Sequence, residues 1–456
     1  MKRILVVSYH FSPDRSVGSK RPTELVNSLL ERGWHVTVLT RNHGIETTHC
    51  SQEWPESLEI IRAPHLPGLL NPSYIAAKRL IQGARALKKK NEQLTMENVK
   101  PRNHSSSSTG LISFKFWLRR LVISGQAMLN ATKGWLITSL ILLVIQKIKG
   151  RQFDVVISSS PPASVHFLAR FASFLFGGKW IMDLRDPINM WELVMPVCRA
   201  PYRVRFENWL EKGYLQAADH IVVTTDPLMK EMLELAERQE YRYGVTTIYN
   251  GYDGELIREG APYTGTCELA FAGELYANRN PFPLLEAIDA LVKSGKVRKG
   301  GIRFHLYGNC EAWNGLSLRE WAVEHELEDT ILLHGMLSPS SLEQELRQIH
   351  VLVSYAQLQP LQIPAKTFDY LRYPCKSLVI TEESSATGKF VTQNEVGYAA
   401  GDDPVRLQET LQLALKETGE NRIQEGLSQE EWVKRQNFSR EAQNKRYLNL
   451  IDALSD

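Results

Sequence analysis

The sequence predicts an α/β protein made of two doubly wound halves, each a parallel sheet with helices on both faces. Three observations support this prediction. The 456 residues are too many for one ordinary domain and suit two large ones. Patterns of buried strands alternate with patterns of amphipathic helices, which is typical of parallel sheets. This alternation pauses near residues 255–267 and then begins again, as expected for two consecutive domains.

The first β-α-β unit begins at the N-terminus. The pattern predicts a strand over Arg3–Ser8, a helix over Pro22–Arg32 that opens with proline, and a second strand over His35–Leu39. The apolar run after Met1 is too short for a secretory signal, so we interpret it as a buried strand. Strands joined through a helix run parallel, which predicts a parallel sheet.

A polar stretch interrupts this order at residues 91–110, and its four consecutive serines predict a flexible insertion loop. After it, Phe114–Ile123 mixes aromatic and aliphatic residues with Lys and Arg. This segment could lie on an anionic membrane surface, and an ordinary helix packed on the domain explains it equally well. Gly134–Ile148 is apolar but shorter than the ~20 residues of a membrane-spanning helix, so we expect a buried helix there.

The alternation then resumes and continues through the second half. In the first half, the pattern predicts strands over 154–158, 180–183, 220–224 and 245–249, with helices after Pro162 and over 203–217. In the second half, it predicts strands over 268–272, 303–307, 331–333, 351–354 and 378–381, with helices such as 281–294 and 340–348. Ligands of such sheets bind at the carboxyl ends of the strands, so we expect the two sites to face a shared central cleft.

Charge is shared unevenly along the chain. Residues 1–190 carry 26 Lys and Arg against 12 Asp and Glu, whereas the remainder carries 28 against 39. The basic half predicts an anionic partner such as phosphate or anionic lipid, although a solvated basic face without a partner gives the same count. The five cysteines are scattered and form no C-x-x-C pair, which indicates reduced thiols in a cytosolic protein and no metal site.

A phosphate site could form in the loop after the first strand, His10–Arg21. Gly18 and Ser19 lie where a helix begins, and free N–H groups at a helix start favour an anion. Gly18 also permits close approach of a ligand to the backbone. The dinucleotide fingerprint G-x-G-x-x-G is absent, and a plain β-α turn explains this loop as well.

Two further candidates follow strands of the second half. In Phe271–Asn280, a strand ends at Gly273 and Arg279 comes just before a helix, where its guanidinium could clamp a diphosphate. In Ile363–Leu371, Pro364 opens a helix, Lys366 lies in its first turn and Asp369 lies on the same side. A cation at a helix start is unfavourable unless an anion binds there, which favours function over a surface arginine or a Lys–Asp surface pair.

The fourth candidate region combines Ser158–His166 with Asp183–Pro187, which both follow predicted strands. His166 could contact a sugar or an acceptor, and it could equally be an ordinary residue on a helix face. Arg185 and Asp186 could bind an acceptor hydroxyl or phosphate, or Asp186 could cap a helix or pair with Arg185.

These stretches together resemble the bacterial glycosyltransferases of family 4, the retaining GT-B enzymes of surface-polysaccharide assembly. The matching stretches are His10–Leu25, Ile157–Ala169, Trp180–Pro187, Ile248–Asp253, Phe271–Leu275 and Ile363–Leu371. The resemblance implies a GT-B fold of two Rossmann-like doubly wound domains. It implies an acceptor domain over 1–258, a nucleotide-sugar domain over 259–425, and C-terminal helices over 426–456 that cross back to the first domain.

The resemblance also implies an activity. A hexosyl or N-acetylhexosaminyl group would move, with retention, from a nucleotide-diphosphate sugar to a lipid-diphosphate-linked sugar or glycan, as in O-antigen or capsule synthesis. The protein would be cytoplasmic, peripheral on the inner face of the cytoplasmic membrane, and without a nucleic-acid partner. No cofactor is implied beyond the donor substrate, and the base, the sugar and the acceptor stay open.

The site residues that the resemblance implies fall into three groups. The catalytic group consists of Arg279, Lys366 and His166. The group that binds the nucleotide sugar consists of Gly18, Ser19, Gly273, Glu274, Gly308, Asn309, Gln362, Pro364 and Asp369. The group that binds the acceptor consists of Arg21, Asp183, Arg185 and Asp186.

The sequence also departs from the family pattern. Leu361 stands where the family has the first acid of a paired-Glu motif, so Gln359 or Gln362 would take over the sugar contacts, and Asp369 stands where the family has Glu. No D-x-D motif occurs, which predicts that cationic side chains and helix starts, rather than a metal ion, stabilise the leaving diphosphate. Two alternatives stay open: a GT-B sugar-nucleotide epimerase, and an inactive membrane-associated binding subunit, which Leu361 favours.

Overall fold

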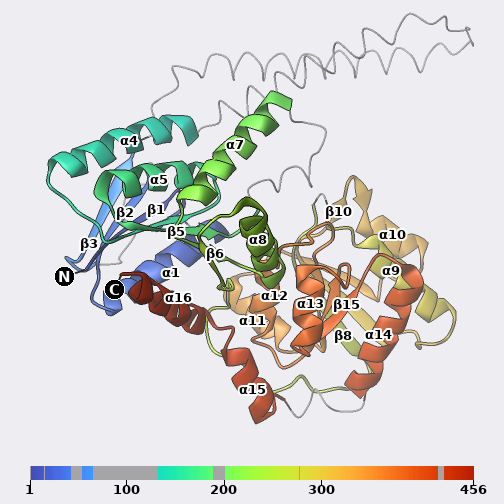
Figure 1. Ribbon diagram of the computed structural model, residues 1–456. Coiled ribbons are helices and arrows are strands. Elements are labelled where there is room, and N and C mark those ends of the chain that lie inside the picture. The colour runs from blue at the N-terminus through green and yellow to red at the C-terminus, as the bar shows by residue number, and fades with distance from the viewer. Residues whose placement is uncertain are drawn as a thin grey trace, which may run out of the picture. The chain divides into compact units, whose positions relative to one another are not determined.

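The computed structural model describes residues 2–14, 16–42, 54–64, 132–187, 201–276, 278–419 and 426–455 (Figure 1). The described residues divide into two compact units. The first contains those up to Ile221 with Tyr241–Gly244, and the second contains Val222–Glu240 and the residues from Val245 to Leu454. The predicted loop at 91–110 and the segment Phe114–Ile123 lie outside the described residues.

The first sheet has seven strands in the order β3-β2-β1-β4-β5-β6-β7. Their bounds are Arg3–Ser8 (β1), His35–Arg41 (β2), Leu58–Ala63 (β3), Val155–Ser159 (β4), Lys179–Leu184 (β5), His220–Val223 (β6) and Gly244–Thr247 (β7). The pairs from β3 through β5 are parallel. Almost every residue of β1, β4 and β5 is buried, as expected for strands covered on both faces.

Four helices accompany this sheet, namely α1 (Val17–Glu31), α4 (Thr132–Ile148), α5 (Ser164–Phe176) and α7 (Pro201–Ala217). Helix α1 lies on one face, and α4 and α5 lie on the other (Figure 1). The expectation of a buried helix over Gly134–Ile148 is wrong for much of its apolar surface. Helix α4 leaves Ile141 55% exposed and Ile148 79% exposed.

The second sheet has six strands in the order β12-β9-β8-β13-β14-β15. Their bounds are Cys267–Glu274 (β8), Ile302–Asn309 (β9), Ile331–Gly335 (β12), Val351–Tyr355 (β13), Lys376–Ile380 (β14) and Gly397–Ala400 (β15). All neighbouring strands pair in parallel. The chain order turns back between β8 and β13, which is the switch point where ligands of doubly wound sheets bind. The predicted doubly wound architecture is confirmed in both sheets.

Helices cover both faces of the second sheet. The helices between and after its strands are Phe282–Lys293 (α9), Leu318–Glu324 (α10), Pro339–Leu346 (α11), Ala365–Tyr370 (α12), Ala386–Gln393 (α13) and Pro404–Gly419 (α14). The second unit also contains Asp226–Gln239 (α8) and Gln429–Gln436 (α15), and the last helix is Arg440–Ser455 (α16). A short hairpin pairs β10 (Ala312–Trp313) with β11 (Leu316–Ser317). On one face, Ile288 of α9 and Leu411 of α14 pack with Phe304. On the other face, Tyr370 and Leu346 pack with Leu352.

The chain turns after the first half at two glycines. Gly251 and Gly254 adopt φ of 68° and 85°. Arg440, at the start of α16, holds this turn by donating to the carbonyl oxygen of Asn250 at 2.6 Å and by pairing with Asp253. The turn and the start of α16 are therefore tied together within the second unit.

Candidate functional site

The carboxyl edge of the second sheet brings together four of the residues predicted to bind the nucleotide sugar. Gly273 and Glu274 end β8, and they pair with Gly308 and Asn309 at the end of β9. The side-chain amide of Asn309 donates to Oε1 of Glu274 at 3.0 Å. Because β8 borders the switch point of this sheet, these residues lie where a doubly wound fold binds its ligand.

The two glycines allow an unusually close approach at this edge. Gly308 has φ of 110°, which L side chains rarely adopt, and a Cβ there would lie 2.1 Å from the carbonyl oxygen of Gly273. A Cβ on Gly273 would lie 3.2 Å from Cε of Lys366. Gly308 therefore requires glycine, whereas a side chain at Gly273 would have to displace the ring of Phe271 or the side chain of Lys366, which lies close to the end of β8.

Lys366 and Asp369 lie three residues apart on α12, which Tyr370 fixes to the sheet. The buried hydroxyl of Tyr370 accepts a hydrogen bond from the backbone N–H of Ala272 at 3.1 Å. Burial raises the pKa of Cys310, at the end of β9, to about 12, and the nearby Lys366 ammonium opposes this increase. The position of Lys366 is therefore set by the sheet and not by a mobile loop.

Arg279 lies on the loop between β8 and α9. Its guanidinium carbon lies 4.5 Å from the ring centre of Tyr276, and Nη1 donates to the carbonyl oxygen of Glu274 at 3.2 Å. Its buried Nε atom has no hydrogen-bond partner among the residues that the structure describes. Burial raises the pKa of Tyr370, and the Arg279 charge opposes this shift. Lys366 and Arg279 therefore both lie near the end of β8, beside Gly273 and Glu274.

Gln357 positions Arg279, and this role of Gln357 was not predicted from the sequence. Its Oε1 atom accepts from the N–H of Asn280 at 3.0 Å, while Nε2 donates to the carbonyl oxygen of Asn280 at 3.1 Å and to Asp402 at 2.8 Å. Asn278 donates to the backbone carbonyl of Gln357 at 2.6 Å. The residues on both sides of Arg279 are thereby bonded to Gln357. No local motif signals this arrangement, because Gln357 and Asn280 are far apart in the sequence.

The loop from Leu358 to Pro364 is held through its backbone. The hydroxyl of Thr225 donates to the carbonyl oxygen of Leu361 at 2.7 Å, and that of Thr387 donates to the carbonyl oxygen of Gln362 at 2.9 Å. Pro364 is the N-cap of α12 and provides no side-chain cap. The backbone at Leu361 is thus fixed, whereas its side chain cannot replace the acid of the family motif.

In the first unit, Gly18 and Ser19 lie in the first turn of α1. The buried hydroxyl of Ser19 donates to the carbonyl oxygen of Ser16 at 2.8 Å and also contacts the carbonyl oxygen of Asp14. The carbonyl oxygen of Gly18 accepts from Nη1 of Arg185 at 2.6 Å. Ser19 therefore stabilises its own loop, and the structure brings the predicted residues Gly18 and Arg185 together.

A charged cluster beside this loop was not predicted from the sequence. Nδ1 of His10 lies 2.7 Å from Asp14 Oδ2, and Arg41 Nη2 lies 3.1 Å from the same oxygen. Burial raises the pKa of Asp14, but hydrogen bonds from His10 and Ser16 outweigh burial and hold this pKa well below its usual range. Asp14 is therefore an anion that fixes the loop.

Arg21 and Asp183 form a buried, two-pronged ion pair. Nη2 of Arg21 lies 3.0 Å from Oδ1 of Asp183, and Nε lies 3.1 Å from Oδ2, which also accepts from the hydroxyl of Ser159 at 2.8 Å. The two side chains are only 7% and 1% exposed. The pair therefore cross-links α1 and β5, and its contact with the acceptor stays a prediction. Arg185 and Asp186 stay predicted acceptor residues.

His166 is fully buried, and its catalytic role stays a prediction. Its Nδ1 lies 2.8 Å from the hydroxyl of Ser158, which accepts from the indole N–H of Trp180 at 2.9 Å. Nε2 of His166 has no hydrogen-bond partner in the described part of the chain. Burial lowers the pKa of His166 to about 3, although Asp183 opposes this decrease. The ring is a neutral core residue.

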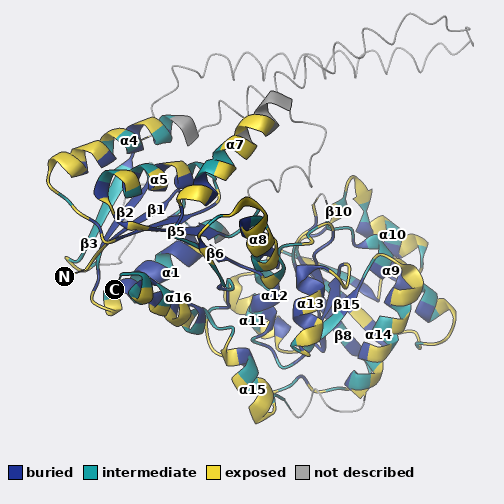
Figure 2. Cartoon of the chain, viewed as in Figure 1, coloured by how far each residue is buried: buried dark blue, intermediate teal, exposed yellow. Residues whose placement is uncertain are grey.

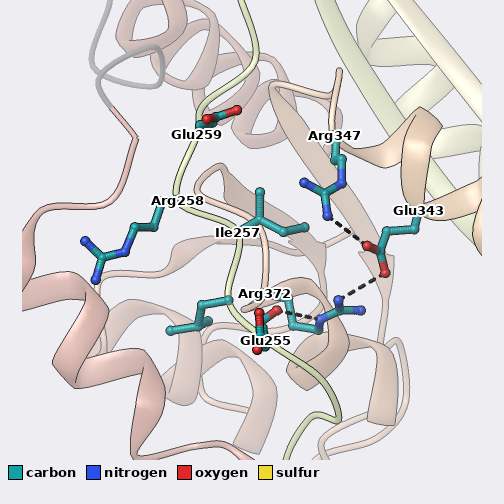
Figure 3. Close-up of a pocket in the computed structure, with 8 residues that line it drawn as sticks. Glu255, Ile257, Arg258, Glu259, Glu343, Arg347 and Arg372 are labelled. Carbon is teal, nitrogen blue, oxygen red and sulfur yellow. Dashed lines mark hydrogen bonds and ion pairs between the residues drawn. The ribbon is translucent and has the colours of Figure 1, made fainter.

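A polar pocket of about 470 Å³ lies elsewhere in the second unit (Figure 3). Figure 3 shows Glu343 between two arginines, at 2.9 Å from Arg347 and 3.0 Å from Arg372. Hydrogen bonds from both arginines hold the pKa of Glu343 below its usual range. These residues come just before β13 and β14, so the pocket lies at the amino ends of the strands. It contains none of the predicted site residues.

The described part of the chain also bears on other kinds of site. No group of three or more His, Cys, Asp and Glu side chains in that part is arranged to hold a metal ion. Its cysteines Cys267, Cys310 and Cys375 are buried free thiols. None of the described helices is both long enough and apolar enough to cross a membrane.

Comparison with known proteins identifies a family and a fold. A model of the glycosyl transferase 4-like domain matches residues 18–251. No curated protein matches the sequence.

Several solved structures resemble the whole chain. Sucrose-phosphate synthase from Thermosynechococcus elongatus is 14% identical, with coverage of 100% of this chain and 99% of that one and a TM-score of 0.61. Anabaena HepE in complex with UDP-glucose is 11% identical, with coverage of 99% and 100% and a TM-score of 0.56. The lipopolysaccharide outer core galactosyltransferase WaaB is 10% identical, with coverage of 99% of each chain and a TM-score of 0.58. At these identities the likeness shows the fold, which is the predicted GT-B fold.

Proposed function

The chain belongs to the glycosyl transferase 4-like family, and from this premise we propose that it is a retaining glycosyltransferase. The donor would be a nucleotide-diphosphate sugar, and the group transferred would be a hexosyl or N-acetylhexosaminyl group. The acceptor would be a lipid-linked sugar or glycan in O-antigen or capsule synthesis. The enzyme would work in the cytoplasm, peripheral on the inner face of the membrane.

The observation that carries this proposal is the pair of cations, Lys366 and Arg279, at the switch-point edge of the second sheet. Both lie near the end of β8, which pairs with the end of β9, and Gly273 and Gly308 leave the backbone open there. A leaving nucleotide diphosphate gains negative charge as the sugar departs, and fixed cations stabilise that charge most when they need not reorganise. The clamp by Gln357 and the anchor through Tyr370 provide this preorganisation.

We propose that side chains next to Lys366 and Arg279 bind the nucleotide. Asp369 would accept hydrogen bonds from the ribose hydroxyls, and Glu274 with Asn309 would border the base. HepE was solved with UDP-glucose, which supports a nucleotide sugar as the donor here. Gln362 and Pro364 would contact the donor sugar, whereas Gly18 and Arg185 of the first unit would contribute to sugar and acceptor binding.

The proposed reaction keeps the configuration at the anomeric carbon. The bond from this carbon to the phosphate oxygen breaks while the acceptor oxygen attacks from the same face. The acceptor proton passes to the leaving phosphate oxygen, so no protein carboxylate needs to become a nucleophile. Lys366 and Arg279 balance the charge of the departing diphosphate, and we propose that these side chains take the place of a D-x-D-bound metal, because the sequence has no such motif.

One alternative has a specific observation in its favour. Leu361 replaces an acid of the family motif, and its backbone carbonyl is engaged by Thr225. A chain that binds the nucleotide sugar but transfers nothing would fit this replacement. Such a binding subunit would bind the donor with wild-type affinity and release no nucleotide.

The direct test is turnover of radiolabelled nucleotide sugars with a lipid-diphosphate acceptor, followed by product analysis and anomeric NMR. We expect a glycosylated lipid with the donor's anomeric configuration. A nucleotide sugar isomerised without acceptor would indicate the epimerase, and donor binding without release would indicate the binding subunit. Candidate donors can be chosen by thermal shift, since a ligand at 100 times its dissociation constant stabilises a protein by about 2.7 kcal/mol.

A further inference from the structure

Helix α4 exposes a row of aliphatic side chains on the side that faces away from its domain. The α4 apolar stripe is the set of its exposed aliphatic residues, which follow the spacing of one helical face: Ile137, Ile141, Val144, Ile145 and Ile148. All five are between 38% and 79% exposed. A helix that packs on a domain in water turns such a stripe towards the core.

The buried side of α4 mixes apolar and polar residues. Trp135 and Leu143 are buried there together with Ser139 and Gln146. Nε1 of Trp135, Oγ of Ser139 and Oε1 of Gln146 find no hydrogen-bond partner in the described part of the chain. Unpaired buried polar atoms destabilise a fold, so this side gains less from burial than a fully apolar side would. The aliphatic residues on the outer side stay available to a partner outside the domain.

The neighbouring helices extend this apolar surface with aromatic side chains. Helix α5 contacts both α4 and α7. On α5, Phe174 is 86% exposed, and on α7, Phe206 and Trp209 stack on each other at 5.9 Å with Trp209 67% exposed. Figure 2 shows the exposed residues along α4 and α7. Tryptophan and phenylalanine are the residues that peripheral proteins place in the headgroup region of a bilayer.

The charges around this surface match an anionic bilayer. Helices α4, α5 and α7 together contain six Lys and Arg against two Glu, and α4 and α5 contain no acidic residue. Lys147 of α4 extends its ammonium group over the ring of Phe176 at 5.8 Å, which places a cation beside the apolar stripe. In the sequence directly before α4, residues 65–131 carry 11 Lys and Arg against 2 Asp and Glu. A partner of net negative charge is therefore favoured.

We propose that the outer surface of α4, α5 and α7 docks on an anionic lipid bilayer, with the α4 apolar stripe and the Phe206–Trp209 pair buried among the headgroups. The proposal rests on the proposed function in one respect: docking on a bilayer would bring the enzyme to a lipid-linked acceptor. It names a surface other than Phe114–Ile123, which stays a separate prediction.

The test is flotation of the full chain with vesicles of phosphatidylcholine, with and without phosphatidylglycerol, in the absence of any nucleotide sugar. We expect the wild type to float with the anionic vesicles and much less with the neutral ones. The double variant Ile141→Ser with Ile148→Ser should lose about tenfold or more in vesicle partition, because two aliphatic anchors are removed. Trp209→Ala should weaken binding in the same direction.

The matched control is Val405→Ser with Leu413→Ser, which changes two exposed aliphatic residues of α14 in the same way. It should float like the wild type. Equal flotation of the α4 variant and the wild type, or no wild-type flotation, overturns the proposal.

Two other results also count against docking. A wild-type dimer that the α4 variant dissociates would assign the surface to a second copy. A large fall in melting temperature of the α4 variant would assign it to another segment of the same chain. Donor binding by the α4 variant should stay unchanged, so failure of docking and failure of the proposed activity give different results.

Discussion

The substitution Gln357→Leu removes the clamp on Arg279 without touching the proposed ligand contacts. Leucine keeps the approximate size of the side chain but loses two hydrogen bonds to Asn280 and one to Asp402. A neutral hydrogen bond contributes about 1 kcal/mol and one to a charged group about 2 kcal/mol, so the free energy of unfolding should fall by about 3 to 4 kcal/mol.

Gln357→Leu should also slow the reaction in the molecules that stay folded. With the clamp gone, the loop that carries Arg279 loses its connection to Gln357, and a misplacement of about 1 Å can cost roughly a hundredfold in rate. We expect kcat to fall by about ten- to a hundredfold when measured well below the melting temperature, with a smaller change in KM. Urea unfolding measures the change in the free energy of unfolding, and steady-state sugar transfer measures the changes in kcat and KM.

The control for this variant is Gln393→Leu, at the exposed end of α13, which should leave both quantities unchanged. If Gln357→Leu lowers stability but keeps the wild-type kcat, then the clamp is only structural and does not position Arg279. If neither quantity changes, the hydrogen bonds to Asn280 do not contribute as the geometry indicates.

Three further predictions concern single positions. Lys366→Ala and Asp369→Ala should each abolish transfer, with the Lys366 change costing about a hundredfold or more, while circular dichroism shows a folded protein; wild-type turnover in either would remove that residue from the site. Gly308→Ala should lower the free energy of unfolding far more than Gly300→Ala. Both glycines have positive φ, but only at Gly308 would the added Cβ lie 2.1 Å from a backbone oxygen. Equal losses in the two variants would mean that the ends of the strands can separate freely. Burial lowers the pKa of His166 to about 3 from an ordinary 6.5, so its neutral form stabilises the fold fully above pH 6.5 and progressively less as pH falls towards 3. The variant His166→Gln should therefore show a smaller change of melting temperature with pH over that window. An unchanged pH profile would contradict the buried assignment.

The fold was largely predictable because its signals are local. The apolar runs at Arg3–Ser8 and from His35 are strands β1 and β2 at the predicted starts, since strands covered on both faces carry continuous apolar sequence. Strand β3 was missed, and its residues are only partly buried apart from Ala63, so its pattern is weaker. Helix α8 was missed although Thr225 and Pro227 form a recognisable helix start.

The site was predictable where it depends on strand ends and not where it depends on burial. Gly273, Gly308 and Lys366 meet because neighbouring parallel strands end at the same edge, which the order of elements already implies. The interior positions of His166 and of the Arg21–Asp183 pair were not foreseen, because polar residues after a strand look the same whether they face solvent or the core. The partners of Gln357 are distant in sequence, so only the folded chain reveals them.

The exposed surface of α4 shows a second limit of sequence reasoning. Its apolar composition predicts burial, and the hydropathy of a segment does not say whether water, protein or lipid surrounds it. Only the folded chain shows that the aliphatic residues Ile141 and Ile148 lie on the exposed side of α4.

The claim that Lys366 and Arg279 neutralise the nucleotide diphosphate is tested most directly by calorimetric titration of UDP and GDP, with and without a chelator, into the wild type and Lys366→Ala. One of the nucleotides should bind the wild type equally well in both buffers, and the variant should bind it about tenfold more weakly or worse, equivalent to ~1.4 kcal/mol. Loss of wild-type binding on chelation, or equal affinity of the variant and the wild type, would contradict the account.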